Sequence, residues 1–240
     1  MRRILITGAS GGLGQALCRG FSKDNVRLGL HCFQNQAAVD ALRGSLENST
    51  CDARVLRADL GKPAAVHQLF EEIRETWGGL EVLIHSAASN RNRLFCDVPS
   101  SEWEDQIQLN LSGTFYCMRE AANIMHAQKN GHIINIASLA AFTGRRGQSA
   151  YTASKRGLIA LSQSAAKEWG RDGIQVNVVC PGFLPTAMTA GLNTKQKKRL
   201  ISENVLGHPS SLDEVSEFIR GLSKMRHVSG QVFNLDSRIQ

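Results

Sequence analysis

Short apolar runs alternate with segments of helical periodicity along the whole chain. Runs rich in Ile, Leu and Val indicate buried strands, and apolar residues spaced three and four apart indicate one face of a helix. The runs predict strands at residues 4–7, 26–32, 54–58, 80–85, 132–137, 173–180 and 230–235. The periodic segments predict helices at residues 15–21, 37–46, 64–77, 102–128, 150–165 and 212–222. This alternation is typical of an α/β fold with a doubly wound parallel sheet of about seven strands and helices on both faces.

Composition and charge narrow the class of protein. The chain has 240 residues, of which 42% are hydrophobic and only 6% aromatic, and this suits one large domain spanning residues 1–240. Its net charge is +7, but the basic residues are scattered, and the densest cluster, at 195–199, has no aromatic neighbours on which bases could stack. We therefore expect no nucleic-acid binding, and we attribute the charge to attraction of phosphate-bearing cofactors or acidic partners.

The six cysteines give no sign of a metal site or a disulfide framework. They stand at positions 18, 32, 51, 96, 117 and 180, with no Cys-x-x-Cys pair and no histidine at ligand spacing. No apolar run approaches the roughly 18 residues of a membrane span, and the segment before the first glycine is too short for the apolar core of a signal peptide. We therefore predict a cytoplasmic protein without membrane or metal partners.

A glycine-rich turn follows the first predicted strand. Residues 8–14 have the sequence Gly-Ala-Ser-Gly-Gly-Leu-Gly and lead directly into a helix. Glycines let the backbone approach a pyrophosphate closely, and the free N–H groups of the new helix attract it. The turn therefore indicates a dinucleotide site.

The end of the second predicted strand bears on the choice of dinucleotide. NAD enzymes often place a carboxylate there to bind the ribose hydroxyls, whereas this chain has Cys32, Phe33 and Gln34. The missing carboxylate removes a repulsion against a 2′-phosphate. No arginine stands at these positions either, and Gly11 occupies a place where a basic residue could have been. On balance we expect NADP(H) in preference to NAD(H).

Three residues in the middle of the chain suggest proton transfer. Ser138 follows the strand at 132–137, and parallel sheets place their ligands at the carboxyl ends of strands. Tyr151 and Lys155 lie one turn apart on the next helix, so that an ammonium neighbours a phenol. That charge would lower the pKa of the tyrosine toward the working range of a general acid or base. Taken alone, a Tyr-x-x-x-Lys pair also fits an ordinary exposed helix face.

Other positions admit more than one interpretation. Asp59 follows the third strand and either accepts a hydrogen bond from an adenine amino group or caps the next helix. Asn110 lies inside the helix at 102–128, where an asparagine needs a reason, although it could simply face water. Residues 183–203 are polar and suit a mobile lid over a substrate.

Taken together, these motifs resemble those of the short-chain dehydrogenase/reductases, over essentially the whole chain. The resemblance rests on Thr7-Gly8-x-x-x-Gly12-x-Gly14, Asn110, Ser138, Tyr151-x-x-x-Lys155 and Pro181-Gly182, in this order. Within the family the chain is most similar to the 3-oxoacyl-[acyl-carrier-protein] reductases, on the stretches 131–138, 173–183 and 186–189. The resemblance implies a single-domain Rossmann-type fold. Residues 1–90 would mainly bind the cofactor, and residues 91–240 would carry catalysis and the substrate.

The resemblance also implies a role for each site residue. Tyr151 would donate a proton to the substrate carbonyl while Ser138 hydrogen-bonds the same oxygen. Lys155 would bind the nicotinamide ribose and lower the pKa of Tyr151, and Asn110 would hold a water of the proton relay. The implied cofactor-binding residues are Gly8, Ser10, Gly12, Leu13, Gly14, Asp59, Leu60, Ser86, Ala87, Tyr151, Lys155, Pro181, Gly182, Leu184 and Thr186.

The activity implied is NADPH-dependent reduction of a 3-oxoacyl thioester, bound to acyl carrier protein, to the (3R)-hydroxyacyl product in fatty acid biosynthesis by a homotetramer. Lys129 and Arg171 fall near positions where such reductases present basic residues to the carrier protein. One alternative is a reductase or dehydrogenase of another ketone or secondary alcohol. Another is a nucleotide-binding partner subunit without turnover. Departures from the family pattern prompt the latter, because residues 85–88 replace the usual Asn-Asn-Ala-Gly and residues 236–238 replace the usual Gly-Gly.

Overall fold

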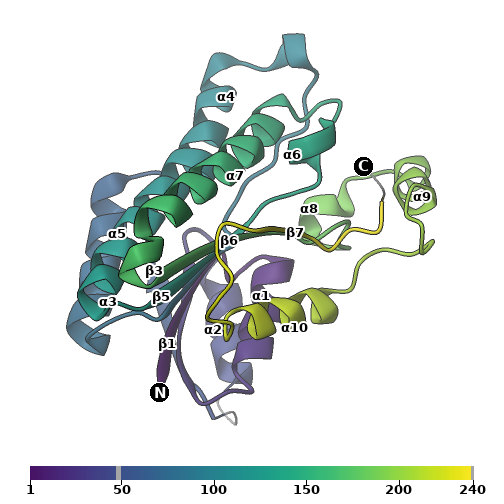
Figure 1. The fold of residues 1–240 in the computed structure, drawn as a ribbon. Coiled ribbons are helices and arrows are strands. Elements are labelled where there is room, and N and C mark those ends of the chain that lie inside the picture. The colour runs from purple at the N-terminus through teal and green to yellow at the C-terminus, as the bar shows by residue number, and fades with distance from the viewer. Residues whose placement is uncertain (47–49, 239–240) are drawn as a thin grey trace.

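The computed structural model describes residues 1–46 and 50–238 and is built on one parallel sheet (Figure 1). The sheet has seven strands, as predicted, and their order is β3-β2-β1-β4-β5-β6-β7. The strands are β1 (Arg2–Thr7), β2 (Val26–Cys32), β3 (Asp52–Arg57), β4 (Val82–His85), β5 (Gly131–Ile136), β6 (Ile174–Cys180) and β7 (Val232–Asn234). Because β1 lies between β2 and β4, the loops after β1 and β4 diverge, and open α/β sheets bind ligands in the crevice formed there.

Helices cover both faces of the sheet (Figure 1). One face carries α1 (Gly12–Phe21), α2 (Gln36–Ser45) and α10 (Leu212–Leu222), and the other carries α3 (Pro63–Trp77), α4 (Ser100–Ile107), α5 (Gly113–Gln128) and α7 (Ser149–Trp169). Successive residues of β1 point to opposite faces, so Ile4 and Ile6 join the core under α1 and α10 while Leu5 joins the core under α3 and α5. Burial on both faces explains the unbroken apolar run that predicted this strand.

The predicted helix at 102–128 contains an irregular turn. Between α4 and α5 the backbone widens into a π-helical turn, η2 (Gln108–Ser112), with Asn110 at its centre. Such turns are frequent at functional sites. The helix therefore exists as predicted, but its regular hydrogen-bond ladder changes at the asparagine.

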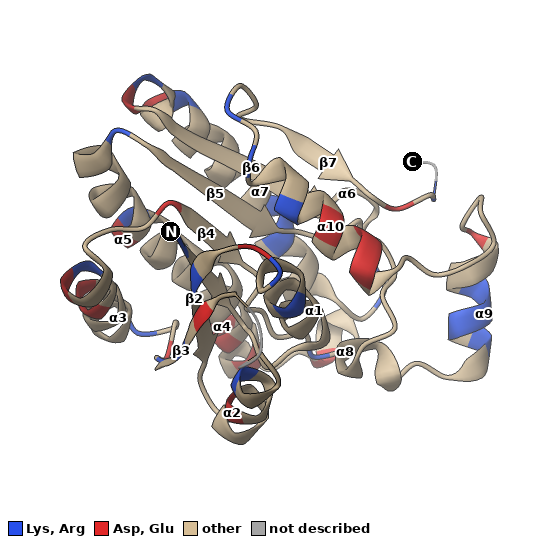
Figure 2. Ribbon diagram, turned by 90° about the horizontal axis from the view of Figure 1, so that it is seen from below, with Lys and Arg blue, Asp and Glu red and all other residues tan. Residues whose placement is uncertain are grey.

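The polar segment at 183–203 is also more regular than expected. It contains α8 (Ala187–Ala190) and α9 (Thr194–Ser202), and capping boxes at Thr186 and Asn193 start the two helices. In Figure 2 much of the α9 ribbon is blue, the colour of Lys and Arg. Whether this segment moves as a lid stays a prediction.

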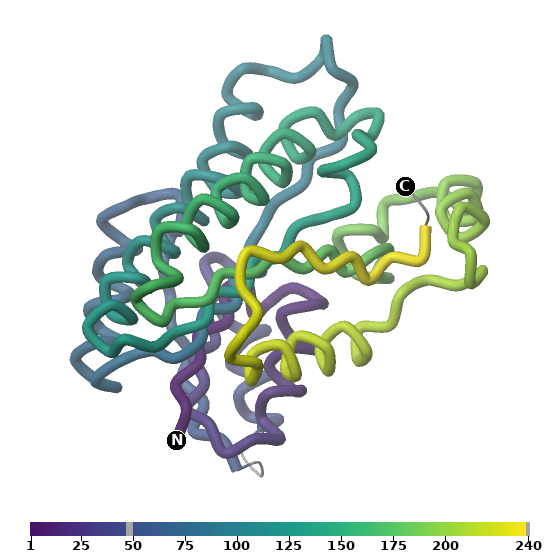
Figure 3. The backbone as a smooth tube through the Cα atoms, viewed as in Figure 1, coloured from purple at the N-terminus to yellow at the C-terminus, as the bar shows by residue number. Residues whose placement is uncertain are grey.

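The remaining elements are short. They are η1 (Phe95–Asp97), α6 (Ala140–Thr143) and η3 (Gly170–Asp172). After β7 the chain runs back toward the segment that follows α9 (Figure 3), and the N–H of Val205 donates to the carbonyl oxygen of Ser237 at 3.3 Å. In the described ranges, no helix has both the length and the apolar character needed to cross a membrane.

Candidate active site

A cavity of about 1070 Å³ lies at the carboxyl ends of the strands. Its walls come from the glycine turn, the loops after β2, β4, β5 and β6, and parts of α7 and α9. Most of the predicted site residues line it, namely Gly8, Ser10, Gly12, Leu13, Gly14, Leu60, Ser86, Ala87, Ser138, Tyr151, Lys155, Pro181, Gly182, Leu184 and Thr186. Asp59 and Asn110 lie outside the lining.

The glycine turn is packed too closely against other parts of the chain to accommodate side chains. A Cβ atom on Gly14 would stand 2.1 Å from the carbonyl oxygen of Gly8, and one on Gly12 would stand 2.8 Å from Cγ2 of Thr186. The N-cap of α1 is Gly11, which offers no side chain to the first N–H groups of the helix. Free N–H groups and the positive end of the helix dipole therefore face the cavity, and this arrangement fits the pyrophosphate of a dinucleotide.

The loop after β4 packs directly on this turn. Gly8 has a φ of +73°, and a Cβ atom there would stand 2.8 Å from Cα of Ala87. The hydroxyl oxygen of Thr7 accepts hydrogen bonds from the N–H groups of Ser86 and Ala87 at 3.1 and 3.2 Å. The strand ends β1 and β4 are thus held together at the floor of the cavity.

His85 replaces an asparagine of the family pattern and is buried. Thr7 Oγ1 lies 3.2 Å from its Nδ1 atom, and because Oγ1 already accepts two N–H groups, its hydroxyl proton is directed to that nitrogen. Burial lowers the pKa of His85 to about 3, so the ring is neutral at pH 7. The histidine therefore supports the loop after β4 without adding a charge beneath it.

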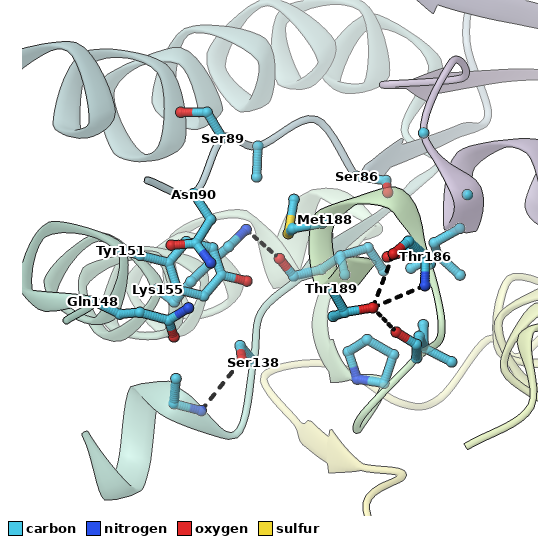
Figure 4. A pocket seen from close by; sticks show the side chains of 18 of the residues that line it. Ser86, Ser89, Asn90, Ser138, Gln148, Tyr151, Lys155, Thr186, Met188 and Thr189 are labelled. Atoms are coloured by element: carbon cyan, nitrogen blue, oxygen red, sulfur yellow. Dashed lines mark hydrogen bonds between the residues drawn. The ribbon is translucent and has the colours of Figure 1, made fainter. Parts of the chain in front are cut away.

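Ser138, Tyr151 and Lys155 meet beside the end of β5 (Figure 4). Ser138 Oγ accepts a hydrogen bond from the N–H of Ala140 at 3.2 Å, which orients the hydroxyl. Burial raises the pKa of Tyr151, while hydrogen bonding with Ser138 acts in the opposite direction. Burial has the larger effect, so the phenol is protonated at neutral pH and can act as a proton donor.

Lys155 is buried, and its contacts differ from the expectation. Its Nζ atom donates to the carbonyl oxygen of Ile136 at 2.7 Å and lies 5.8 Å from the centre of the Tyr151 ring. Burial lowers the pKa of Lys155 to about 8. The net pKa of Tyr151 is nevertheless raised, because desolvation of the phenol outweighs the effects that favour the phenolate. Whether Lys155 lowers that pKa stays a prediction.

Asn110 supports the site from behind. Its side chain is 0% exposed, so the interpretation that it faces water is wrong. Oδ1 accepts a hydrogen bond from the N–H of Ser89, and Nδ2 donates to the carbonyl oxygen of Ser89, each at 2.8 Å. The asparagine thus fastens the loop after β4, which lines the cavity, to the helix that contains η2.

Asp59 stabilises a turn outside the cavity. Its Oδ1 atom accepts a hydrogen bond from the N–H of Gly61 at 3.0 Å. The N-cap of α3 is Lys62, and no side chain caps that helix. Asp59 therefore shapes the approach to the helix without capping it, and its contact with adenine stays a prediction.

Several lining residues were not foreseen from the sequence. They include Arg145, Gln148 and Arg238. Gln148 Nε2 donates to Asn92 Oδ1 at 2.8 Å, which joins the loop after β4 to the start of α7. No local motif marks these positions, since loops from distant parts of the sequence bring them together.

Arg57 was also missed. It pairs with Cys32 in the ladder between β2 and β3, and its Nε atom donates to the carbonyl oxygen of Phe33 at 3.1 Å. Phe33 lines the cavity, so a guanidinium stands beside the end of β2, where no arginine was expected. The register of the two strands could have revealed it.

The described residues show no cluster of three His, Cys, Asp or Glu side chains that could hold a metal ion. No disulfide joins the six cysteines, all of which lie among the described residues.

Comparison with known proteins decides the family. The family model described as short chain dehydrogenase matches residues 2–197. The chain belongs to this family. Short-chain dehydrogenases are NAD(P)-dependent oxidoreductases, in agreement with the glycine turn and the Ser138, Tyr151 and Lys155 arrangement described above.

Relatives of known name span nearly the whole chain. The 3-oxoacyl-[acyl-carrier-protein] reductase of Synechocystis sp. is 31% identical over 232 residues, covering 97% of this chain and 94% of its own length. The enzyme of the same name from Staphylococcus aureus is 28% identical over 237 residues, covering 98% of this chain and 96% of its own. A crystal structure of an actinorhodin polyketide ketoreductase variant with NADPH superposes with a TM-score of 0.91 at 24% identity, over 98% of this chain and 96% of that one. At that identity the likeness shows the shared fold.

Proposed function

We propose that the protein reduces a 3-oxoacyl thioester, carried on acyl carrier protein, to the (3R)-hydroxyacyl thioester, in fatty acid biosynthesis in the cytoplasm. The observation that carries this proposal is one cavity containing both the uncapped glycine turn and the Ser138, Tyr151 and Lys155 group. The names of the relatives support the substrate class. NADPH, when bound, supplies the hydride.

Tyr151 is the proton donor in this proposal. Its raised pKa keeps the phenol protonated at neutral pH, and a protonated phenol can transfer its proton to the carbonyl oxygen of the substrate. The Ser138 hydroxyl lies in the same part of the cavity and hydrogen-bonds that oxygen as negative charge develops on it.

Lys155 and Asn110 position these groups. Below its pKa of about 8 the lysine is charged, and it would hold the nicotinamide ribose through Nζ hydrogens that Ile136 does not use. Both polar atoms of the Asn110 side chain bond to Ser89. We therefore assign Asn110 to positioning the loop after β4, and a relay water beside it stays a hypothesis.

The rest of the cavity would bind the cofactor. Residues 8–14 would hold the pyrophosphate, residues 181–186 would surround the nicotinamide, and Asp59 with Leu60 would lie near the adenine. In this arrangement residues 1–90 form mainly the cofactor half of the domain, and residues 91–240 the catalytic and substrate half.

Arg57 supports NADP(H) in preference to NAD(H). Its Nε atom is used by the Phe33 carbonyl oxygen, and its two terminal nitrogens are left for a 2′-phosphate at the end of β2. Asp40 on α2 also influences the Cys32 thiol, with a charge opposite to that of Arg57, but it does not line the cavity.

Assembly into a homotetramer is part of the proposal. Trp103 on α4 and Phe115 on α5 are 39% and 42% exposed, and large exposed apolar side chains suit a subunit interface. Lys129 and Arg171, the expected carrier-protein contacts, lie just before β5 and β6. These two residues lie at the amino ends of the strands, whereas the cavity of the same chain lies at the carboxyl ends. They could therefore guide a carrier protein only to the cavity of another subunit.

The test is loss of absorbance from NADPH, and in parallel from NADH, with acetoacetyl thioesters of coenzyme A and of acyl carrier protein. We expect oxidation of NADPH, with the carrier-bound substrate preferred. Turnover of other ketones but neither thioester would contradict the proposed substrate class. Tight cofactor binding without turnover of any carbonyl compound would favour a subunit that binds nucleotide only.

A further inference from the structure

The charges that line the cavity are strongly unbalanced. Among the described lining residues, the cationic side chains are Arg145, Arg146, Lys155, Arg199 and Arg238, and the one carboxylate is Glu203. Glu203 Oε1 accepts a hydrogen bond from Arg199 Nε at 2.8 Å, so these two charges offset each other. The other cations remain to be explained.

Arg238 is held in place by a buried acid. Its Nε atom donates to both carboxylate oxygens of Asp236, at 2.9 and 3.0 Å, and the Asp236 side chain is 0% exposed. This pair occupies the stretch where the family pattern has Gly-Gly. The last described residues therefore place a fixed guanidinium in the cavity wall.

Arg145 has no such partner. It is half-buried on the segment between α6 and α7, and its guanidinium makes neither a hydrogen bond nor an ion pair with any described residue. Burial and the nearby Arg238 lower its pKa, while Tyr151 and Glu203 act in the opposite direction. A partly buried cation without a counter-ion is unfavourable unless a ligand supplies one.

The cofactor phosphates are poor candidates for that ligand. The pyrophosphate fits the N-terminus of α1, and Arg57 stands at the end of β2. Arg145 instead lies near Tyr151 and Arg238, and all three residues line the cavity. The reacting carbonyl is expected next to Tyr151, so an anionic group that pairs with Arg145 would belong to the substrate.

We propose that Arg145, with Arg238 beside it, binds an anionic group carried by the carbonyl substrate. The inference rests on the proposed reduction of a thioester next to Tyr151. Two parts of such a substrate can carry the charge, namely a carboxylate on the acyl chain and the phosphate of a phosphopantetheine arm. Either makes charge-assisted, bidentate hydrogen bonds with a guanidinium.

Two matched pairs of substrates distinguish the sources. The first pair is an N-acetylcysteamine thioester of a 3-oxo acid with a terminal carboxylate and its methyl ester, neither of which contains phosphate. The second pair is acetoacetyl phosphopantetheine and acetoacetyl pantetheine. In one of the pairs we expect kcat/KM to favour the charged member by about tenfold or more, as one strong ionic hydrogen bond gives. Arg145→Gln should abolish that preference while changing the neutral member little.

Arg156→Gln is the control. Arg156 is exposed on α7, stacks over Phe142 with its Cζ 5.2 Å from the ring centre, and does not line the cavity. The Arg156→Gln substitution removes a positive charge close to Arg145 and should leave the preference for the charged substrate intact. Equal kcat/KM for both members of both pairs, or a preference that survives in Arg145→Gln, would overturn the proposal.

Calorimetric titration of the same four compounds separates this inference from the proposed reaction. If no thioester is reduced, the proposed function fails, but the binding constants still report on Arg145. Tighter binding of a charged member to the wild type, lost in Arg145→Gln, would support the anion site. Equal binding of charged and neutral members would reject it.

Discussion

The Nζ atom of Lys155 donates a hydrogen bond to the carbonyl oxygen of Ile136 at 2.7 Å. This contact fixes the middle of the cavity, because it joins α7 to the last residue of β5 just before Ser138. It also holds an ammonium group in the protein interior, where burial lowers its pKa to about 8. The arrangement has a consequence for stability as well as for catalysis.

Stability should depend on pH through Lys155. The folded-state pKa of about 8 lies below the ordinary 10.5, so between these values the unfolded chain binds more protons and the lysine's contribution to stability rises with pH. Lys155→Met lacks this rise. From pH 7 to pH 10.5, we expect the free energy of unfolding of the wild type to rise relative to that of the variant by on the order of 3 kcal/mol. Urea denaturation across this range measures it, and parallel curves would contradict the assignment.

Tyr151→Phe should separate binding from chemistry. The aromatic ring remains, so cofactor affinity should change little, while loss of the proton donor should lower kcat by a factor of about 10² to 10⁴. Nucleotide binding is followed by fluorescence titration and turnover by NADPH absorbance. Wild-type turnover in this variant would remove Tyr151 from the mechanism.

Arg57→Ala should reduce the preference of the protein for NADP(H) over NAD(H). Loss of a charge-assisted contact to a 2′-phosphate should weaken binding of 2′,5′-ADP by about tenfold or more and leave binding of 5′-AMP nearly unchanged. Both are measured by calorimetry without any substrate. Arg54→Ala is a matched control, because Arg54 on the same strand pairs with Glu72 on α3. An equal loss for both nucleotides would indicate a structural role for Arg57.

Asn110→Ala should destabilise the fold. The change leaves the partly buried N–H and carbonyl oxygen of Ser89 without their partner, at a cost of about 2 kcal/mol. Asn193→Ala, which removes only the exposed cap of α9, should cost about 1 kcal/mol. Chemical denaturation compares them. Similar losses for the two variants would mean that the contact with Ser89 contributes little.

Phe115→Glu should disrupt the proposed tetramer. A carboxylate in an apolar interface would be buried without a partner, so the variant should sediment as a smaller species. Met225→Glu places the same charge on another exposed apolar residue, after α10, and should leave the assembly unchanged. A monomeric wild type, or a Phe115→Glu variant of the same mass as the wild type, would exclude an interface at this residue.

Local sequence patterns predicted the sheet and its helices well. The buried runs around Ile4 and Ile133 leave few alternatives to strands of a parallel sheet, and the alternation with helices indicates parallel pairing, but the strand order was not predicted from the sequence. The π-helical turn at Asn110 could not be predicted in the same way. At this turn Asn110 contacts Ser89, which a different part of the chain supplies.

The chemistry of the site was harder to predict than its location. The spacing of Tyr151 and Lys155 correctly placed them in one cavity, but the pKa of Tyr151 depends on burial, which spacing alone does not show. Arg145 and Arg238 lie far apart in the sequence and share the cavity only because the chain end returns past α9. Contacts between charged residues so far apart in the sequence leave no local sequence pattern from which they could be predicted.

The strand order also affects how the protein folds during its synthesis. β1 emerges from the ribosome first, yet it pairs with β4, which is complete only at His85. Until then β1 has one unpaired edge, and its apolar residues at 4–6 are open to pairing with other chains. A nascent chain that stalls before His85 therefore exposes this edge, and a chaperone could protect it in that interval.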